Sequence, residues 1–302
     1  MRRGTALALV VASAACFGTL AVLGALAYRY GARPLPLPAW RFATAIVVMG
    51  GYVAVRRPGA LVAARADLGR FVLLSVAGYG AASMCFFFAL GHASAAVVTV
   101  LLYTYPALVA LYETLAGRSK LSWTTVAGVI MTFAGCALVV GLLDAEIHVD
   151  AVGTILGLGA GVGYASFTVM SGRLVGGHSR LVVMTFLFGV SAVVIGCVSL
   201  LAGESLSPAG WTPALWAVLA LLVVIPPTIV AVALYMGGIR RLGASRAAIA
   251  STTEPLFTIV LAWLLLGDRL TVMQAIGALL VVAGVMLAER FGTGASETVL
   301  PA

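Results

Sequence analysis

Residues 254–284 read EPLFTIVLAWLLLGDRLTVMQAIGALLVVAG. Two long apolar runs lie on either side of the short polar segment Gly267-Asp268-Arg269. A membrane-spanning helix needs about 20 mostly apolar residues, because it must cross about 30 Å of hydrocarbon with its backbone hydrogen bonds formed internally. When the residues next to them are included, the two runs become spans 244–266 and 270–289 and reach that length. They predict two membrane helices joined by a tight turn.

A similar composition continues through the whole chain. Hydrophobic residues make up 62% of the 302 residues and charged residues 9%, whereas a soluble domain has about 45–50% apolar and about 25% charged residues. This excludes a soluble globular protein, a disordered chain and a nucleic-acid-binding domain. The sequence predicts an all-α membrane protein with ten transmembrane helices. The expected spans are 6–28, 36–55, 71–91, 94–116, 122–142, 151–172, 181–202, 213–238, 244–266 and 270–289.

The basic residues predict how these helices are oriented. When the chain is threaded alternately through the membrane, 14 of its 18 Lys and Arg residues fall on one side. Only Arg29, Arg33 and Arg269 fall on the other side, and Arg41 lies within the second span. Cytoplasmic loops carry an excess of Lys and Arg. We therefore expect a multi-pass protein of the bacterial inner membrane with both termini cytoplasmic and an uncleaved first span.

The two halves of the chain resemble each other at an offset of 149 residues. Because each half holds five spans, an odd number, the second half would enter the membrane from the opposite side. We expect residues 1–143 and 151–290 to form two inverted five-helix repeats around a central cavity, and 291–302 to be a disordered cytoplasmic tail. The matches include Thr104 with Thr253, Pro106 with Pro255, Leu121 with Leu270, Gly128 with Gly277 and Gly135 with Gly284.

Residues 106–135 and 254–284 resemble the EamA-type ten-helix exporters of the drug/metabolite transporter (DMT) superfamily. Members usually have a proline, an apolar helix, Gly-Glu-x-Leu and then a glycine-spaced helix. Here Asp268 stands where Glu is usual, residues 117–121 lack the acid, and Arg41 matches an early arginine of the family. Among bacterial members the chain looks most like the YddG-type exporters of aromatic amino acids. The resemblance implies outward movement of a small solute through a central cavity.

Glu254 is the most informative single residue. It lies about eight residues into the ninth span, and a carboxylate at that depth costs roughly 3 kcal/mol. It must face a polar cavity, pair with a base or stay protonated. We expect it to couple protons or to bind a substrate amine, unless it only bonds backbone groups freed by Pro255. Ser251 and Thr252 precede it, and either contact the substrate or satisfy nearby carbonyl groups.

Arg41 lies about five residues from the outer end of the second span. Its depth differs from that of Glu254 by roughly 10 Å at 1.5 Å per helical residue, so a direct ion pair is not expected. One interpretation is that Arg41 attracts a substrate carboxylate. The favoured alternative is that its long side chain reaches the outer lipid headgroups.

Aromatic residues and prolines add two further predictions. Tyr79, Tyr103 and Tyr164 lie deep in three spans at comparable depth, with Phe167 nearby, and either line an aromatic cavity or pack between helices. Prolines interrupt the fourth, ninth and eighth spans, where they act as hinges or as fixed kinks that shape the cavity. The hinge candidates are Pro106, Pro255, Pro226 and Pro227.

The sequence shows no pattern typical of an enzyme. The histidines His92, His148 and His178 all fall in expected loops, and neither an H-E-x-x-H nor a phosphate-binding G-x-x-x-x-G-K-[ST] motif occurs. We expect no metal and no cofactor. The predicted function is secondary transport, by alternating access, of a small-molecule substrate such as an amino acid. The expected partners are that substrate and membrane lipid, with a monomer favoured. The alternatives are an intramembrane enzyme and a channel-like facilitator.

Overall fold

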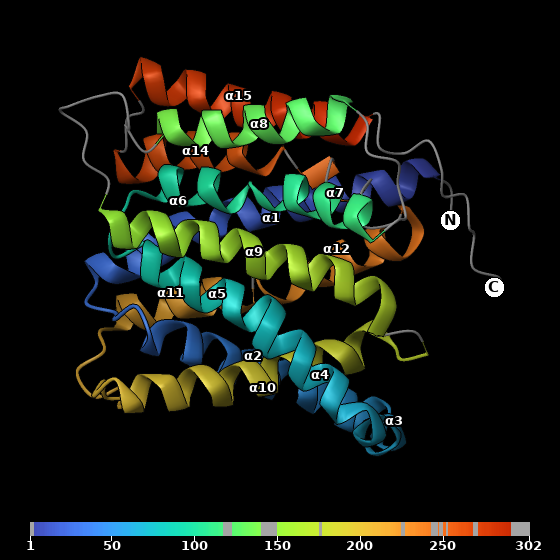
Figure 1. Ribbon diagram of the computed structural model, residues 1–302. Coiled ribbons are helices and arrows are strands. Elements are labelled where there is room, and N and C mark those ends of the chain that lie inside the picture. The colour runs from blue at the N-terminus through green and yellow to red at the C-terminus, as the bar shows by residue number, and fades with distance from the viewer. Residues whose placement is uncertain are drawn as a thin grey trace.

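The computed structural model describes residues 3–116, 123–139, 150–174, 177–224, 227–242, 247, 250–251, 253–267 and 271–290. The regular secondary structure of these residues is entirely helical, and the helices lie side by side in one bundle (Figure 1). The all-α class predicted from the sequence is confirmed for the described residues. Thr252, Pro226, the acid-free turn 117–121 and the tail 291–302 lie outside them.

Helices occupy each of the ten expected ranges. They are α1 (Arg3–Arg29), α2 (Pro36–Arg56), α3 (Pro58–Ala64), η1 (Arg65–Asp67), α4 (Leu68–Leu74), η2 (Ser75–Tyr79), α5 (Gly80–Ala89), α6 (Ala95–Leu102), α7 (Tyr105–Leu115), α8 (Trp123–Val139), α9 (Ala151–Leu174), α10 (Arg180–Leu201), α11 (Pro213–Val224), α12 (Ile229–Leu242), α14 (Glu254–Leu266) and α15 (Val272–Arg290).

Six helical runs in the described part of the chain are long and apolar enough to cross a membrane: Thr5–Arg29, Pro36–Arg56, Gly59–Ala89, Ala95–Tyr112, Ala151–Ser171 and Arg180–Leu201. Shorter apolar helices cover Val126–Leu138, Pro213–Leu222, Phe257–Leu266 and Val272–Gly284. The structure thus contains several candidate spans. The count of ten spans and their inverted repetition stay predictions.

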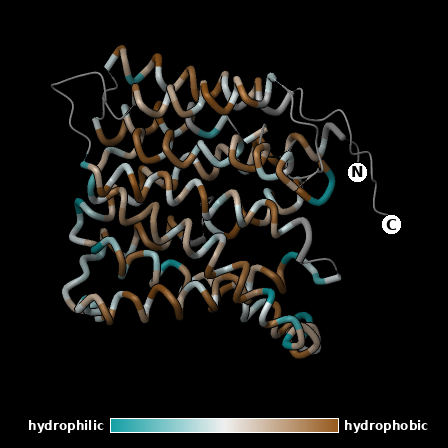
Figure 2. The backbone as a smooth tube through the Cα atoms, viewed as in Figure 1, coloured by the Kyte–Doolittle hydropathy of each residue, from teal (hydrophilic) through white to brown (hydrophobic). Residues whose placement is uncertain are grey.

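The outer surface of the bundle is apolar. Val47, Leu201 and Leu264 are 74%, 89% and 61% exposed. Figure 2 shows hydrophobic residues along the lengths of the helices and hydrophilic residues gathered toward the two ends of the bundle. An exposed apolar surface of this extent is typical of contact with lipid.

Glycines bring α8 and α15 into backbone contact. A Cβ atom added at Gly135 would lie 2.6 Å from the carbonyl oxygen of Gly277, and one added at Gly284 would lie 2.7 Å from that of Gly128. Small residues allow helices to approach this closely. The two contacts are reciprocal, since Gly128 and Gly135 lie 149 residues before Gly277 and Gly284.

Several helices are interrupted near the middle of the bundle. The π-helix η2 separates α4 from α5, and its Gly78 has non-helical dihedral angles, with φ −122° and ψ −114°. Tyr103 and Thr104 separate α6 from α7, and α7 and α14 each carry a proline in their first turn, Pro106 and Pro255. Proline is tolerated there because those backbone N–H groups lack helical partners in any case.

The glycine contact gives a test of the fold. Gly284→Val should lower the free energy of unfolding by about 1–3 kcal/mol, because the new side chain meets the backbone of α8 and has no space to move into. Unfolding of the purified protein in detergent measures the change. Gly51→Val is the matched control, since an added Cβ there meets nothing within 4 Å. Equal effects of the two substitutions would contradict this packing.

Candidate functional site

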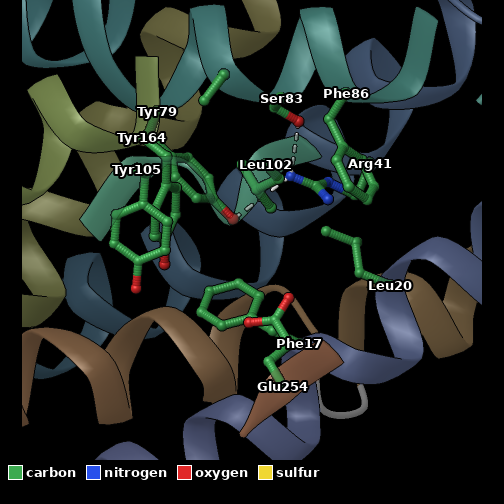
Figure 3. Close-up of a pocket in the computed structure, with 11 residues that line it drawn as sticks. Phe17, Leu20, Arg41, Tyr79, Ser83, Phe86, Leu102, Tyr105, Tyr164 and Glu254 are labelled. Carbon is green, nitrogen blue, oxygen red and sulfur yellow. Dashed lines mark hydrogen bonds between the residues drawn. The ribbon is translucent and has the colours of Figure 1, made fainter. Parts of the chain in front are cut away.

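A small cavity lies where the interrupted helices meet (Figure 3). Its volume is about 30 Å³, room for roughly two water molecules. Side chains from both halves of the chain line it. They are Phe17 and Leu20 of α1, Arg41 of α2, Tyr79 of η2, Ala82, Ser83 and Phe86 of α5, Leu102 of α6, Tyr105 of α7, Tyr164 of α9 and Glu254 of α14.

Arg41 is fully buried and points into the cavity (Figure 3). Its Nη2 donates to Ser83 Oγ at 3.0 Å and to Tyr79 Oη at 3.5 Å. The guanidinium carbon lies 4.4 Å from the ring centre of Phe42 and 5.0 Å from that of Phe87. Nε and Nη1 have no hydrogen-bond partner among the described residues. The expectation that Arg41 reaches the lipid headgroups is wrong, because the side chain turns inward onto aromatic rings and a serine.

Glu254 is the first residue of α14 and is only 7% exposed. Its Oε2 lies 2.8 Å from Tyr103 Oη, which also lies 2.5 Å from the carbonyl oxygen of Ser251. Glu254 and Arg41 line the same cavity, although in the described structure they form no direct ion pair. The sequence analysis did not expect a direct ion pair between them, and it did not predict that they line one cavity.

The predicted aromatic residues form one cluster around Tyr164. The ring centre of Tyr164 lies 4.7 Å from that of Tyr105, 5.7 Å from Phe167 and 6.4 Å from Tyr79. Tyr79 and Tyr164 face the cavity, whereas Phe167 and Tyr103 are buried behind its wall. The structure therefore brings the four predicted aromatic residues together but places only two of them on the cavity surface.

A row of hydroxyl groups runs from Ser251 through Tyr105 of the cavity wall to Tyr235 and Thr168. Ser251 Oγ is hydrogen-bonded to Tyr105 Oη, which lies 3.3 Å from Tyr235 Oη. Tyr235 Oη lies 3.3 Å from Thr168 Oγ1, and Thr168 donates to the carbonyl oxygen of Tyr164 at 2.8 Å. These bonds fix the segment before α14 to α7, α12 and α9.

Comparisons with known proteins assign the family. A family model described as "EamA-like transporter family" matches residues 4–141 and again 151–289. The chain belongs to the EamA-like transporter family. The resemblance inferred from residues 106–135 and 254–284 is thereby confirmed at the level of the family, while the YddG-type resemblance stays a hypothesis.

Relatives of this EamA-like transporter are named as transporters. The uncharacterized transporter YcbK of Bacillus subtilis is 30% identical over 66% of this chain and 67% of its own. The uncharacterized inner membrane transporter YicL of Salmonella typhimurium is 24% identical over 74% of this chain and 73% of its own. A crystal structure with 21% identity covers 96% of this chain and 98% of its own with a TM-score of 0.67, which shows similarity of fold alone.

Two functional candidates were missed by the sequence analysis of this EamA-like transporter. Tyr235 carries the hydroxyl row across the bundle, and Ser83 holds Arg41 in the cavity wall. Both stand in apolar spans with no distinguishing neighbours. Tyr105 could have been found, because it lies 149 residues before Glu254 and both residues line the cavity.

The two histidines in the described residues lie at the ends of the bundle and not in the cavity. His92 Nδ1 lies 2.6 Å from Asp150 Oδ2, and His178 Nε2 lies 2.7 Å from Asp67 Oδ2. The backbone N–H of Val152, and after it His92, lower the pKa of the Asp150 carboxyl group. The pair His178–Asp67 joins the two halves of the chain, whereas the pair His92–Asp150 joins the first half to the residue just before α9.

Proposed function

We propose that this EamA-like transporter exports amino acids, aromatic ones favoured, and related small metabolites across the bacterial inner membrane by alternating access. The observation that carries the proposal is the buried guanidinium of Arg41, whose Nε and Nη1 lack partners in the described structure, in a cavity walled by tyrosines. Unpaired buried charge is costly. A binding site for an anionic group explains why the chain keeps it.

The chemistry of the cavity favours a carboxylate attached to a flat apolar group. Guanidinium groups form strong charge-assisted hydrogen bonds with carboxylates. Aromatic side chains beside them offer favourable edge and face contacts to a second ring. Because the cavity offers only about 30 Å³, we propose that helices around it move apart when an amino acid enters.

Alternating access is supported by repetition in the helix boundaries. Three helices of the first half begin 149 residues before three of the second: α5 at Gly80 and α12 at Ile229, α7 at Tyr105 and α14 at Glu254, α8 at Trp123 and α15 at Val272. Helix contacts repeat too. In the two halves α5 corresponds to α12 and α1 corresponds to α9; α5 packs on α9, and α12 packs on α1. We therefore keep 1–143 and 151–290 as the proposed inverted repeats, one state being the mirror of the other.

The proposed moving parts are the interrupted helices. Pro106 and Pro255 lie in the first turns of α7 and α14, and Pro227 lies between α11 and α12. Backbone at such breaks lacks the complete hydrogen bonding of a helix and changes its dihedral angles at lower cost. We propose hinges at these three sites, with Ser251 held beside the hinge at Pro255.

Arg41 provides the direct test of substrate class. Arg41→Gln should slow counterflow of radiolabelled L-phenylalanine in proteoliposomes by about 10–100-fold, because a hydrogen bond to a charged group contributes about 1.5–3 kcal/mol. Phenethylamine, which lacks the carboxylate, should be affected little. The control variant is Arg33→Gln at the exposed end of the bundle. Equal losses for both solutes would remove Arg41 from substrate recognition, and flux without exchange would indicate a channel.

Tyr164 tests the aromatic wall. Tyr164→Ala should weaken transport of L-phenylalanine more than that of L-leucine, because the ring of Tyr164 lies at the centre of the aromatic cluster. Apparent affinities for the two solutes, measured side by side, give the comparison. Parallel losses would assign Tyr164 to helix packing alone.

The orientation of the chain is tested by labelling. In a variant with its four cysteines replaced, a single cysteine at Gly203 should react with a membrane-impermeant thiol reagent added to whole cells. A cysteine at Arg57 should react only after the cells are opened. Labelling of both positions from the same side would contradict the proposed inverted threading.

A further inference from the structure

The hydroxyl group of Tyr103 has two acceptors and one proton. Its oxygen lies 2.8 Å from Glu254 Oε2 and 2.5 Å from the carbonyl oxygen of Ser251. A phenol donates only one hydrogen bond, while a carboxylate and a carbonyl group only accept. If Glu254 were ionised, one of the two contacts would bring two acceptors together. If Glu254 is protonated, its O–H donates to Tyr103, whose own O–H donates to Ser251, and both contacts are satisfied.

The surroundings of Glu254 point the same way. The carboxyl group is buried and makes no ion pair within the described structure. The groups that face it are the hydroxyl of Tyr103 and, across the cavity, Tyr79, Tyr105, Tyr164 and the cation Arg41; α1 contributes only the apolar Phe17 and Leu20. An ionised carboxylate would be buried without a contacting counter-charge, which proteins avoid.

We infer that Glu254 carries a proton when no substrate is bound in this cavity, and that the amine of an amino-acid substrate takes the place of that proton on binding. The inference rests on the proposed transport function and adds its coupling: one proton moves inward for each amino acid exported. Tyr103 is the positioning residue that holds the carboxyl group. Arg41 binds the other end of the substrate.

The net charge of the cavity changes by one between its two forms. The empty cavity has one positive charge, from Arg41, because Glu254 is neutral. The loaded cavity is neutral overall, because the substrate is a zwitterion and the charges of Arg41 and ionised Glu254 cancel. On loading, the proton leaves Glu254 for water on the cytoplasmic side. After the substrate departs, Glu254 takes a proton from water on the outer side.

This coupling defines the substrate class more narrowly. A substrate coupled to the proton needs a free amine to replace it, and a carboxylate adds the contact with Arg41. N-acetyl-L-phenylalanine keeps the aromatic ring and the carboxylate but cannot form an ammonium group. It should contact Arg41 and still leave the proton on Glu254.

The test uses the full chain in lipid at neutral pH. Infrared spectra of the empty protein should show the carbonyl stretch of a buried protonated carboxyl group, absent in Glu254→Gln and present in Glu204→Gln. The amide that Glu254→Gln introduces can donate to Tyr103 as the protonated acid does, so this variant should fold. L-Phenylalanine should remove the band and release about one proton per protein, measured with a pH dye. N-acetyl-L-phenylalanine should do neither.

The outcomes separate the two proposals. No band attributable to Glu254 in the empty protein would overturn the inference while leaving the transport function intact. Binding of L-phenylalanine without proton release would do the same. Failure of L-phenylalanine to bind would overturn both the exchange and the proposed amino-acid substrate.

Transport gives an independent readout. In proteoliposomes with the membrane potential clamped, a pH difference of about one unit should drive roughly tenfold accumulation of L-phenylalanine in a one-for-one exchange, since the two gradients are then energetically equal. Glu254→Gln should abolish this response, whereas Glu204→Gln at the end of the bundle should keep it. A Glu254→Gln protein that still responds to the pH gradient would contradict the coupling.

Discussion

A hydrocarbon environment requires each backbone N–H and C=O group to find its partner inside the protein. The long helices of this chain meet that requirement, and the interrupted helices must meet it with side chains. Tyr103 contacts the carbonyl of Ser251 before α14, and Thr228 donates to the carbonyl of Leu222 in the last turn of α11. The cavity lies beside these breaks, and Tyr103 connects the break before α14 to Glu254 of the cavity wall.

The cavity beside these breaks also contains the buried charge of Arg41. Its contacts with Ser83, Tyr79 and the ring of Phe42 offset part of the cost of leaving water. They leave Nε and Nη1 without partners in the described structure. An acidic residue beside Arg41 would remove that cost and also neutralise the site. Keeping the acid at Glu254, across a cavity, is the arrangement expected of a site that holds a molecule with charges at both ends.

Sequence patterns predicted the helices better than the site. Apolar length located the helical ranges. The recurrence of Gly128 and Gly135 at Gly277 and Gly284 indicated a repeat but did not predict that these glycines bring α8 and α15 together. Depth along a span did not predict the position of Arg41, because depth does not say which face of a helix a residue occupies. Tyr235 and Ser83 were missed for the same reason. Their roles depend on neighbours from α7, α9 and α2 that are distant in sequence.

The differences between the halves matter more for chemistry than their similarity. Tyr105 and Glu254 stand 149 residues apart at the starts of α7 and α14, and both line the cavity, but only one is an acid. The position 149 residues after Arg41 is Val190, which carries no charge. In the proposed repeat, the shared pattern builds a cavity with equivalent walls. Divergence then places the cation on the first half and the acid on the second, so that the zwitterion proposed as substrate would contact both halves.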